Sequence, residues 1–417
     1  MKIGIDASRA FSLQRTGIEE YSYQVIKHLR KELQNEEVFL YVRKGQKIDF
    51  ELPANWKIKT INMPRLWTQL GLSLEMLFHP ADVLFIPAHV VPIIHPKNTI
   101  VTVHGLEFEI FPEGYSFWAR LYMRWSIKMS CKWAKKIIVV SENTKKDLMK
   151  LYDVPEGKIE VIYEGVGNSS SPFGRGCPVF GTGEGSSLNS KNSTISQSTL
   201  IRPSATFSRG EKGIFLKPYL LFIGRLEKRK NIEGIIDAYK ILIEKYKIPH
   251  SLVLAGAPGY GYDVLKLKIQ NYFKIQNSKF KIIEPGFVDE ATKQELLKNA
   301  DIFLFPTFYE GFGLPVLEAQ SVGVPVVCSN TSSLPEIITS KVQPWNQNIL
   351  ELSSKSELSA VLCDPQSPNS IAEAAYSLIS NPTLKNDIIK KGYENVKRFS
   401  WGDCSFRVSK ILTNGNK

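Results

Sequence analysis

Short runs of apolar and β-branched residues recur along this chain in two groups of six, separated by longer segments with a helical pattern. Such runs are buried on both faces when they lie in parallel sheets, and the longer segments then form crossover helices. Twelve strands are too many for one compact sheet of this kind, so the sequence predicts an α/β protein with two sheets. The runs are KIGIDA, VFLYVR, DVLFIP, TIVTVHG, KKIIVVSE and KIEVIYEG, then YLLFIGR, SLVLAGA, KIIEPGF, DIFLFPT, VPVVCSN and SAVLCDP.

A segment of different composition, residues 167–212, separates the two groups. More than half of its residues are Gly, Ser, Thr or Pro. Such a segment buries too little apolar surface to become ordered, so we expect a flexible linker or disordered loop. A second irregular stretch, residues 340–357, is expected to be a surface insertion.

The chain is basic, with 53 Lys and Arg residues against 41 Asp and Glu residues. This excess suggests an anionic partner such as nucleic acid, anionic lipid or a phosphorylated substrate, unless it only reflects a basic proteome. The five cysteines are scattered without a C-x-x-C pair, which fits a reducing compartment. The N-terminus lacks the apolar run of a signal peptide, and the most apolar stretch is too short to span a bilayer. We therefore expect a cytoplasmic protein.

The stretch FYEGFGLPVLEA, residues 308–319, is a candidate binding site. It follows the predicted strand DIFLFPT, and ligands of open parallel sheets bind at the carboxyl ends of the strands. Its proline suits the first turn of a helix, and Gly311 and Gly313 allow a ligand to approach the backbone closely. Glu310 and Glu318 would face one cleft and accept hydrogen bonds from sugar hydroxyls. The alternative is a turn flanked by two solvated glutamates.

Two further segments carry candidate anion-binding groups. After the strand YLLFIG, Arg225 and Lys230 lie near a helix start that Asn231 would cap, which suits a diphosphate. The segment is not a Walker loop, and a solvated basic turn is the alternative. Gly17 follows Thr16 at another helix start, where its N–H would reach a phosphate, although an ordinary loop glycine has the same pattern.

One histidine is a candidate for chemistry. His104 lies directly after the strand TIVTV, where it would orient a hydroxyl or shuttle a proton, unless it is a structural buried histidine. His89 and His95 lack the spacing of metal ligands. The sequence contains no D-x-D pattern, so a divalent metal has no evident carboxylate ligands and we expect no metal site.

The segment FWARLYMRWSIKMSCKWAKK, residues 117–136, combines cations with aromatic residues. Its basic residues repeat every four positions and would form a stripe along a helix, with large apolar residues on the adjoining face. This pattern is typical of a helix at a membrane interface. Alternatively, the aromatic face packs on the sheet and the basic stripe is solvated; no recognised nucleic-acid module accompanies it. The possible membrane contacts are Arg120, Arg124, Lys128 and Lys132.

Together these motifs resemble those of the family 4 glycosyltransferases, which have the GT-B fold of two doubly wound Rossmann-like domains facing a central cleft. The resemblance covers nearly all of the chain except 167–212 and 340–357, and it is strongest from 217 to 336. The matching segments include RTGIEEY, TVHGLEF, IIVVSENTKKDL, KPYLLFIGRLEKRKNI, LVLAGAPGYGYD, the E-x-x-x-x-x-x-x-E motif that begins at Glu310, and LPEII.

The resemblance implies a division of the chain. Residues 1–166 would form the N-terminal, acceptor domain, and residues 213–390 the C-terminal domain that binds a nucleotide-sugar donor. Residues 391–417 would form a C-terminal helix that crosses back to the N-terminal domain.

The resemblance also implies roles for individual residues in binding the nucleotide. Arg225 and Lys230 would hold the donor diphosphate, with Gly17 approaching it from the N-terminal domain. Glu318 would bind the ribose hydroxyls, and the backbone near Val288 would meet the base.

The same resemblance implies which residues meet the donor sugar. His104 would bind the sugar near the reacting carbon, and it and Glu310 are the expected catalytic residues. The chain departs from the family where His104-Gly105 replaces His-Asp and where Glu164-Gly165-Val166 replaces Asn-Gly-Val. The backbone that would grip the sugar together with Glu310 belongs to Gly311, Phe312, Gly313 and Leu314.

The implied activity is that of a metal-independent, retaining hexosyltransferase without a cofactor. It would move mannose or glucose from a nucleotide-diphosphate sugar to a glycan or lipid-linked acceptor, in polysaccharide or glycolipid synthesis at the inner face of a membrane. Front-face attack and double displacement through a carboxylate both remain open. The alternatives are a catalytically idle nucleotide-sugar-binding protein and a GT-B-fold nucleotide-sugar epimerase.

Overall fold

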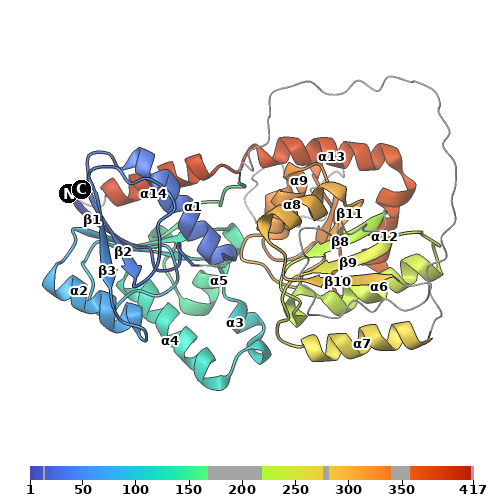
Figure 1. The fold of residues 1–417 in the computed structure, drawn as a ribbon, viewed down its shortest axis with the longest axis horizontal. Coiled ribbons are helices and arrows are strands. Elements are labelled where there is room, and N and C mark those ends of the chain that lie inside the picture. Colours follow the sequence, from blue (N-terminus) through green and yellow to red (C-terminus); the bar gives the residue numbers. More distant parts are fainter. Residues whose placement is uncertain (13–14, 168–217, 276–280, 340–356, 415–417) are drawn as a thin grey trace.

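The computed structural model describes residues 1–12, 15–167, 218–275, 281–339 and 357–414 (Figure 1). The predicted linker at 167–212 and the predicted insertion at 340–357 lie almost entirely outside these residues. The described chain forms two parallel sheets, each covered by its own helices, as the sequence predicts.

The N-terminal unit is built on a seven-stranded sheet with the order β3-β2-β1-β4-β5-β6-β7. Its central strands are buried along their whole length, which explains their continuous apolar sequence. The strands are β1 (Lys2–Asp6), β2 (Glu37–Arg43), β3 (Trp56–Ile61), β4 (Val83–Ile86), β5 (Thr99–Val103), β6 (Lys136–Val139) and β7 (Ile159–Val161).

The helical segments of this unit differ widely in length. The longest two, α4 and α1, are amphipathic, and α1 begins at a capping box formed by Thr16 and Glu19. The segments are α1 (Gly17–Glu32), η1 (Trp67–Leu72), α2 (Ser73–Phe78), α3 (Glu107–Ile110), η2 (Pro112–Gly114), α4 (Phe117–Trp133), α5 (Glu142–Tyr152) and η3 (Glu156–Lys158).

The C-terminal unit is built on a six-stranded sheet with the order β10-β9-β8-β11-β12-β13. The strands are β8 (Tyr219–Ile223), β9 (Ser251–Ala255), β10 (Ile282–Gly286), β11 (Ile302–Phe305), β12 (Val326–Ser329) and β13 (Val361–Cys363). The helical segments are η4 (Lys228–Lys230), α6 (Ile232–Glu244), α7 (Tyr262–Ile275), α8 (Glu290–Asn299), α9 (Leu314–Ser321), α10 (Leu334–Ile338), α12 (Pro368–Ser380) and α13 (Pro382–Val396).

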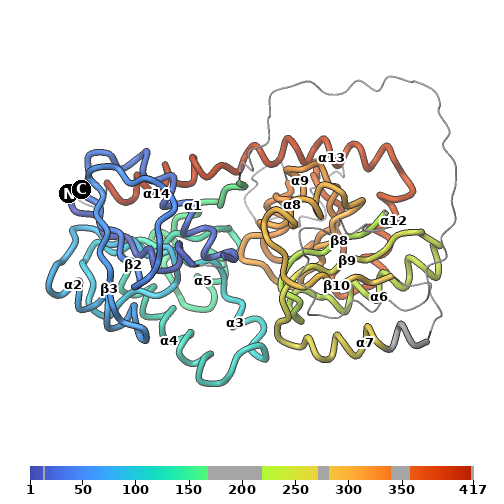
Figure 2. Tube along the Cα trace, in the orientation of Figure 1, coloured from blue at the N-terminus to red at the C-terminus, as the bar shows by residue number. Residues whose placement is uncertain are grey.

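The chain passes from the C-terminal unit back to the N-terminal unit between α13 and the last described helix, α14 (Trp401–Asn414) (Figure 2). There it packs along α1, and the Ser405 hydroxyl donates to the carbonyl of Val25 at 3.4 Å. Arg407 donates to the carbonyl of Val161 at 2.8 Å. The crossing therefore ties the end of the chain to both α1 and β7.

All twelve predicted strands are present, and among the described residues β3 is the one strand that was not predicted. This strand lies at the edge of its sheet, and most of its side chains are at least partly exposed. Its sequence, WKIKTI, therefore lacks the continuous apolar run that marks the buried strands.

In both sheets the strand order reverses at one point, between β1 and β4 and between β8 and β11. The loops after the two strands at such a point diverge and leave room for a ligand. In the second sheet these are the loops that carry the predicted cations and Glu310. No helix of the described residues is long and apolar enough to cross a bilayer.

Candidate active site

The loops after β8 and β11 bring Lys230 and Glu310 together. The Lys230 ammonium lies 2.5 Å from a carboxylate oxygen of Glu310, and both residues are more than 90% buried. Burial lowers the pKa of Lys230, and the charge of Glu310 opposes this shift. In a buried ion pair, the desolvation of both charges cancels much of their mutual attraction. The position of this pair, where the strand order reverses, therefore suggests a role in ligand binding. The alternative of a solvated glutamate is wrong for Glu310.

Arg229 is a third member of this cluster, although it was not among the predicted site residues. Its guanidinium lies 3.6 Å from the Glu310 carboxylate and donates to the carbonyl of Tyr309 at 2.8 Å. It also donates to Glu227 at 2.8 Å. Two cations thus surround the Glu310 carboxylate, and Glu227 balances the charge of Arg229.

Two serines after β12 hold the backbone of the loop that carries Glu310. The Glu310 N–H donates to the Ser332 hydroxyl at 2.9 Å, and the Ser333 hydroxyl donates to the carbonyl of Phe312 at 2.6 Å. The loop is therefore fixed by side chains from the neighbouring strand end before any ligand binds.

The loop turns into α9 at Gly313, which has a φ of +116°. This left-handed conformation suits glycine, and a Cβ would also lie only 2.7 Å from Leu334. Leu314 and Pro315 then open the helix. Proline has no N–H and the Val316 N–H donates to the carbonyl of Gly313 at 3.0 Å, which leaves the N–H of Leu314 at the end of this loop. The Phe312 side chain is buried against Tyr163 and Phe399, so only its backbone is available to a ligand.

Glu318 lies on α9 and pairs with Lys293 of α8, with the two charged atoms 2.8 Å apart. Its side chain is 25% exposed, so it is neither fully solvated nor buried. Lys293 also pairs with Glu290, and the two carboxylates raise its pKa in spite of burial. Val288 lies half-buried in the loop after β10, just before α8.

Arg225 and Gly17 are exposed. Arg225 follows β8, and within the described residues it makes no hydrogen bond or ion pair. Gly17 is the first residue of α1, and no atom lies within 4 Å of the place where its Cβ would be. Asn231 caps α6 as predicted, because its side chain accepts a hydrogen bond from the N–H of Gly234 at 3.2 Å.

His104 follows β5 and is buried, with both ring nitrogens occupied. One nitrogen lies 2.8 Å from the carbonyl oxygen of Pro87, and the other lies 3.3 Å from a carboxylate oxygen of Glu164. Burial raises the pKa of Glu164, and His104 opposes this shift. The ring also meets Tyr21 and His89 edge-on. The departure from the family pattern at Glu164 thus supplies the partner of His104.

The two units touch where the carboxyl ends of their sheets meet. Gly311 lies against the backbone of His104 so closely that a Cβ would be 1.8 Å from the His104 carbonyl oxygen. From the start of α5, the hydroxyls of Ser141 and Thr144 donate to the carbonyl of Gly311 at 2.6 and 3.3 Å. The loop that carries Glu310 is therefore held by both units.

A second contact between the units is made by Glu336 of α10. Its carboxylate accepts hydrogen bonds from the backbone N–H groups of Glu142 and Asn143, at 2.9 and 3.3 Å, in the first turn of α5. Burial raises its pKa to about 7, although these N–H groups oppose the shift. Nothing in the local sequence reveals this role, since the partners are more than 190 residues apart.

The basic stripe of α4 divides into two halves. Arg120 and Arg124 both pair with Glu109, at 3.6 and 2.7 Å, whereas Lys128 and Lys132 are exposed. The solvated lysines agree with the alternative of a basic stripe in water. The aromatic face is split: Trp118 and Trp125 are exposed, so they do not pack on the sheet, whereas Trp133 is half-buried against the core. The helix is buried through Ser126, Ile127, Ser130 and Cys131.

In the part of the chain that the structure describes, no group of three or more His, Cys, Asp or Glu residues is placed to hold a metal ion. The cations of the cluster, together with the helix N-terminus at Leu314, are the groups available to stabilise an anion.

Two family models match separate parts of the chain. Residues 206–395 match the glycosyl transferases group 1 family, and residues 15–168 match Glycosyltransferase Family 4. The O-antigen chain mannosyltransferase B of Escherichia coli is 26% identical over 310 residues, which cover 74% of this chain and 68% of that protein.

Two solved structures share the fold over almost the whole chain. WaaG, a glycosyltransferase involved in lipopolysaccharide biosynthesis, has a TM-score of 0.64 at 13% identity, covering 99% of this chain and 100% of that chain. HepE of Anabaena, solved in complex with UDP and glucose, has a TM-score of 0.62 at 15% identity with the same coverage.

Proposed function

The chain belongs to the group 1, family 4 glycosyltransferases, and on this basis we propose that it transfers mannose or glucose from a nucleotide-diphosphate sugar with retention of configuration. The mannosyltransferase among its relatives supports mannose, and HepE with UDP and glucose supports the alternative donor. The acceptor is a glycan or a lipid-linked sugar in cell-envelope polysaccharide or glycolipid synthesis, at the cytoplasmic face of a membrane.

The buried pair of Lys230 and Glu310 carries this proposal. When a donor binds, its diphosphate is a more highly charged partner for Lys230 than one carboxylate, so the ammonium turns from Glu310 to the phosphate oxygens. Glu310 is then released to accept hydrogen bonds from the sugar hydroxyls. Arg229 remains 3.6 Å from Glu310, so the carboxylate is not left buried without a cation.

Departure of the nucleotide diphosphate places additional negative charge on its bridging oxygen. Lys230, the unpaired Arg225 and the N–H of Leu314 stabilise that charge, which lowers the barrier to breaking the bond to the sugar. Because Leu314 follows a loop that Ser332 and Ser333 fix, this N–H needs little reorganisation in the transition state.

The rest of the nucleotide extends toward α8 in this proposal. Glu318 accepts hydrogen bonds from the ribose hydroxyls, and Lys293 holds its carboxylate in place. The base lies against the backbone at Val288, and Gly17 approaches the diphosphate from the other unit. His104 lies at the junction of the units, where its ring is oriented by Glu164 and Pro87.

A donor panel tests the proposal. Purified protein is incubated with UDP-, GDP- and ADP-sugars, and release of nucleotide diphosphate is followed together with donor affinity by calorimetry. We expect one donor to bind and to be turned over, with both properties weakened in Lys230→Met and Glu310→Gln. Lys268→Met, which removes a partly exposed ion pair with Asp237 elsewhere, is the matched control.

Each result of this panel has a definite meaning. Equal donor affinity in wild type and Lys230→Met would refute the assignment of Lys230 to the diphosphate. Tight binding of one donor without release, even when candidate lipid-linked and glycan acceptors are added, would refute transfer and support the idle binding protein.

A further inference from the structure

Helix α4 exposes an unusual concentration of large apolar side chains. Phe117 and Trp118, at its N-terminal end, are 72% and 75% exposed. Leu121, Tyr122 and Trp125 on the following turns are between 42% and 50% exposed. The surface of a soluble protein seldom carries five such residues within nine positions of one helix unless they contact a partner.

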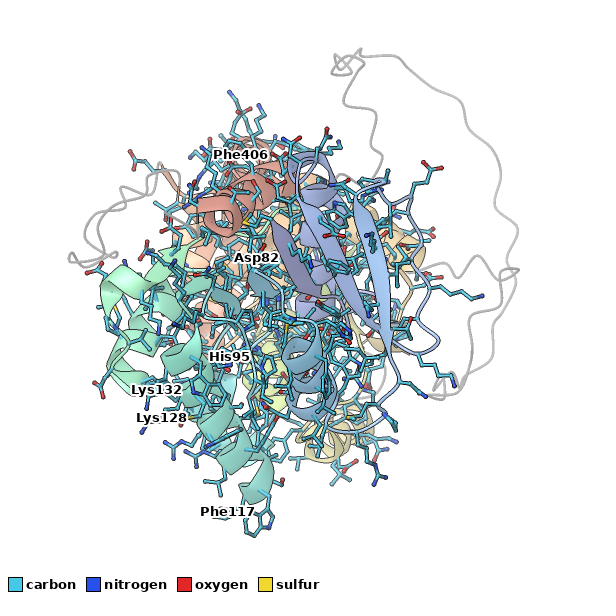
Figure 3. The ribbon with its side chains drawn as sticks, turned by 90° about the vertical axis from the view of Figure 1, so that its left-hand side faces the viewer. Asp82, His95, Phe117, Lys128, Lys132 and Phe406 are labelled. Atoms are coloured by element: carbon cyan, nitrogen blue, oxygen red, sulfur yellow. The ribbon has the colours of Figure 1, made fainter. Side chains whose placement is uncertain are left out.

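The N-terminal end of α4 also projects from the molecule. Figure 3 shows Phe117 at the outer tip of the helix, beyond the rest of the N-terminal unit, with Lys128 and Lys132 further along the same helix. The buried residues of the helix, Ser126, Ile127, Ser130 and Cys131, all lie in its C-terminal half, whereas the N-terminal half is held by the ion pairs of Arg120 and Arg124 with Glu109. Its first two turns are therefore presented to the surroundings instead of to the core.

A neighbouring loop and helix extend this exposed surface. Ile93 and Ile94 are 50% and 38% exposed, and the loop packs against α4 through the rings of His95 and Trp133, whose centroids are 5.3 Å apart. The same loop is joined to α2 by the hydrogen bond from the Ile94 N–H to the Ser73 hydroxyl. At the end of α2, Phe78 is 71% exposed.

The charge of this surface identifies its partner. The segment 117–136 has no acidic residue. Lys128 and Lys132 are exposed, and neither side chain forms an ion pair with any residue that the structure describes. Protein interfaces are depleted in lysine, whereas aromatic rings beside lysine and arginine are the composition of surfaces that bind anionic lipid.

We propose that the α4 surface, formed by α4, residues 93–95 and the end of α2, docks on an anionic lipid bilayer. Phe117 and Trp118 enter the boundary between headgroups and acyl chains, and Lys128 and Lys132 contact the lipid phosphates. This inference rests on the proposed function and deepens it, because it places the enzyme on the same membrane surface as a lipid-linked acceptor.

Vesicle binding tests this inference independently of catalysis. The full chain is floated with vesicles of phosphatidylcholine alone and with vesicles that contain phosphatidylglycerol, at low and high salt. We expect binding to the anionic vesicles that is at least about tenfold stronger than to the neutral ones and that weakens with salt.

Two double variants separate the apolar and the charged contributions. F117S/W118S should weaken binding to anionic vesicles at least about tenfold, and Lys128→Glu with Lys132→Glu should do the same while also removing the salt dependence. The matched control is Phe406→Ser with Lys410→Glu, an exposed aromatic–lysine pair on α14, whose Phe406 lies at the opposite end of this face (Figure 3).

Three results would overturn the inference. These are failure of the wild type to bind anionic vesicles, unchanged binding by F117S/W118S, and binding lost equally in the control. If sedimentation shows a dimer that F117S/W118S abolishes while lipid binding is absent, the surface is a contact between two copies. All variants should retain the wild-type Tm and donor affinity. Vesicle binding is measured without a donor, so it can be interpreted even if the donor panel gives no turnover.

Discussion

Gly311 has no room for a side chain where the two units meet. An ideally placed Cβ would lie 1.8 Å from the carbonyl oxygen of His104 and 2.8 Å from its carbon. The φ of Gly311 lies outside the left-handed region, so alanine causes no backbone strain within its own loop. The three nearest atoms all belong to the other unit, so Gly311→Ala should act by separating the units and not by unfolding the loop.

The separation can be worked out from these contacts. Because Cβ atoms essentially never approach another atom within 3.0 Å, the two backbones must move apart by about 1 Å. A misplacement of about 1 Å between groups that act together costs roughly 10²-fold in rate. We therefore expect kcat for donor turnover to fall about 100-fold. The Lys230–Glu310 ion pair and its contribution to donor affinity should be unchanged.

Two further glycine-to-alanine variants, with milder or no predicted clashes, serve as comparisons. A Cβ on Gly105 would lie 3.2 Å from the Cα of Gly311, so Gly105→Ala should reduce kcat by less than about tenfold. Gly157→Ala, on an open surface, should leave turnover unchanged. The variants are compared by nucleotide diphosphate release with the donor that the panel identifies, and by Tm as a check on folding.

Full activity in Gly311→Ala, with an unchanged Tm, would refute the reasoning. It would mean that the contact between Gly311 and His104 is not part of the reacting conformation. A large fall in Tm would instead show that the loss of activity reflects instability, and the milder Gly105→Ala would then decide the question.

Three further predictions concern the charges of the site. Lys230→Met should raise the donor Kd by roughly 10- to 100-fold, as expected for loss of a hydrogen bond to a charged group, and calorimetry measures this directly. Donor turnover should survive EDTA, because the described residues offer no metal cluster; a strict requirement for a divalent ion would contradict this expectation. Glu336 has a pKa of about 7 in the folded protein against 4.5 ordinarily, so only the folded state binds its proton between these values. Its contribution to stability is therefore largest below about pH 4.5 and falls as the pH rises to about 7. The Tm of wild type relative to that of Glu336→Gln should decline from pH 5 to 7.5. A Tm difference that does not change with pH would refute the pH-dependent contribution of Glu336 to stability.

The sequence by itself determined the elements of this protein and the loops that carry its chemistry. Buried strands need continuous apolar runs, so all but the half-exposed β3 could be recognised. Helix starts depend on residues a few positions apart, which is why the cap at Asn231 and the proline of α9 were predictable. The carboxyl ends of these strands then indicated Lys230 and Glu310 as candidates.

Only the tertiary structure decided which partner each of these groups has. Glu164 lies beside His104, Glu336 caps α5, and Lys293 holds Glu318, although the residues of each pair are 25 to 194 positions apart. Periodicity could place aromatic and basic residues on one helix, but it could not tell which face of α4 is buried. That depends on the surfaces of other elements that pack against the helix, and these are brought together by the fold and not by the local sequence.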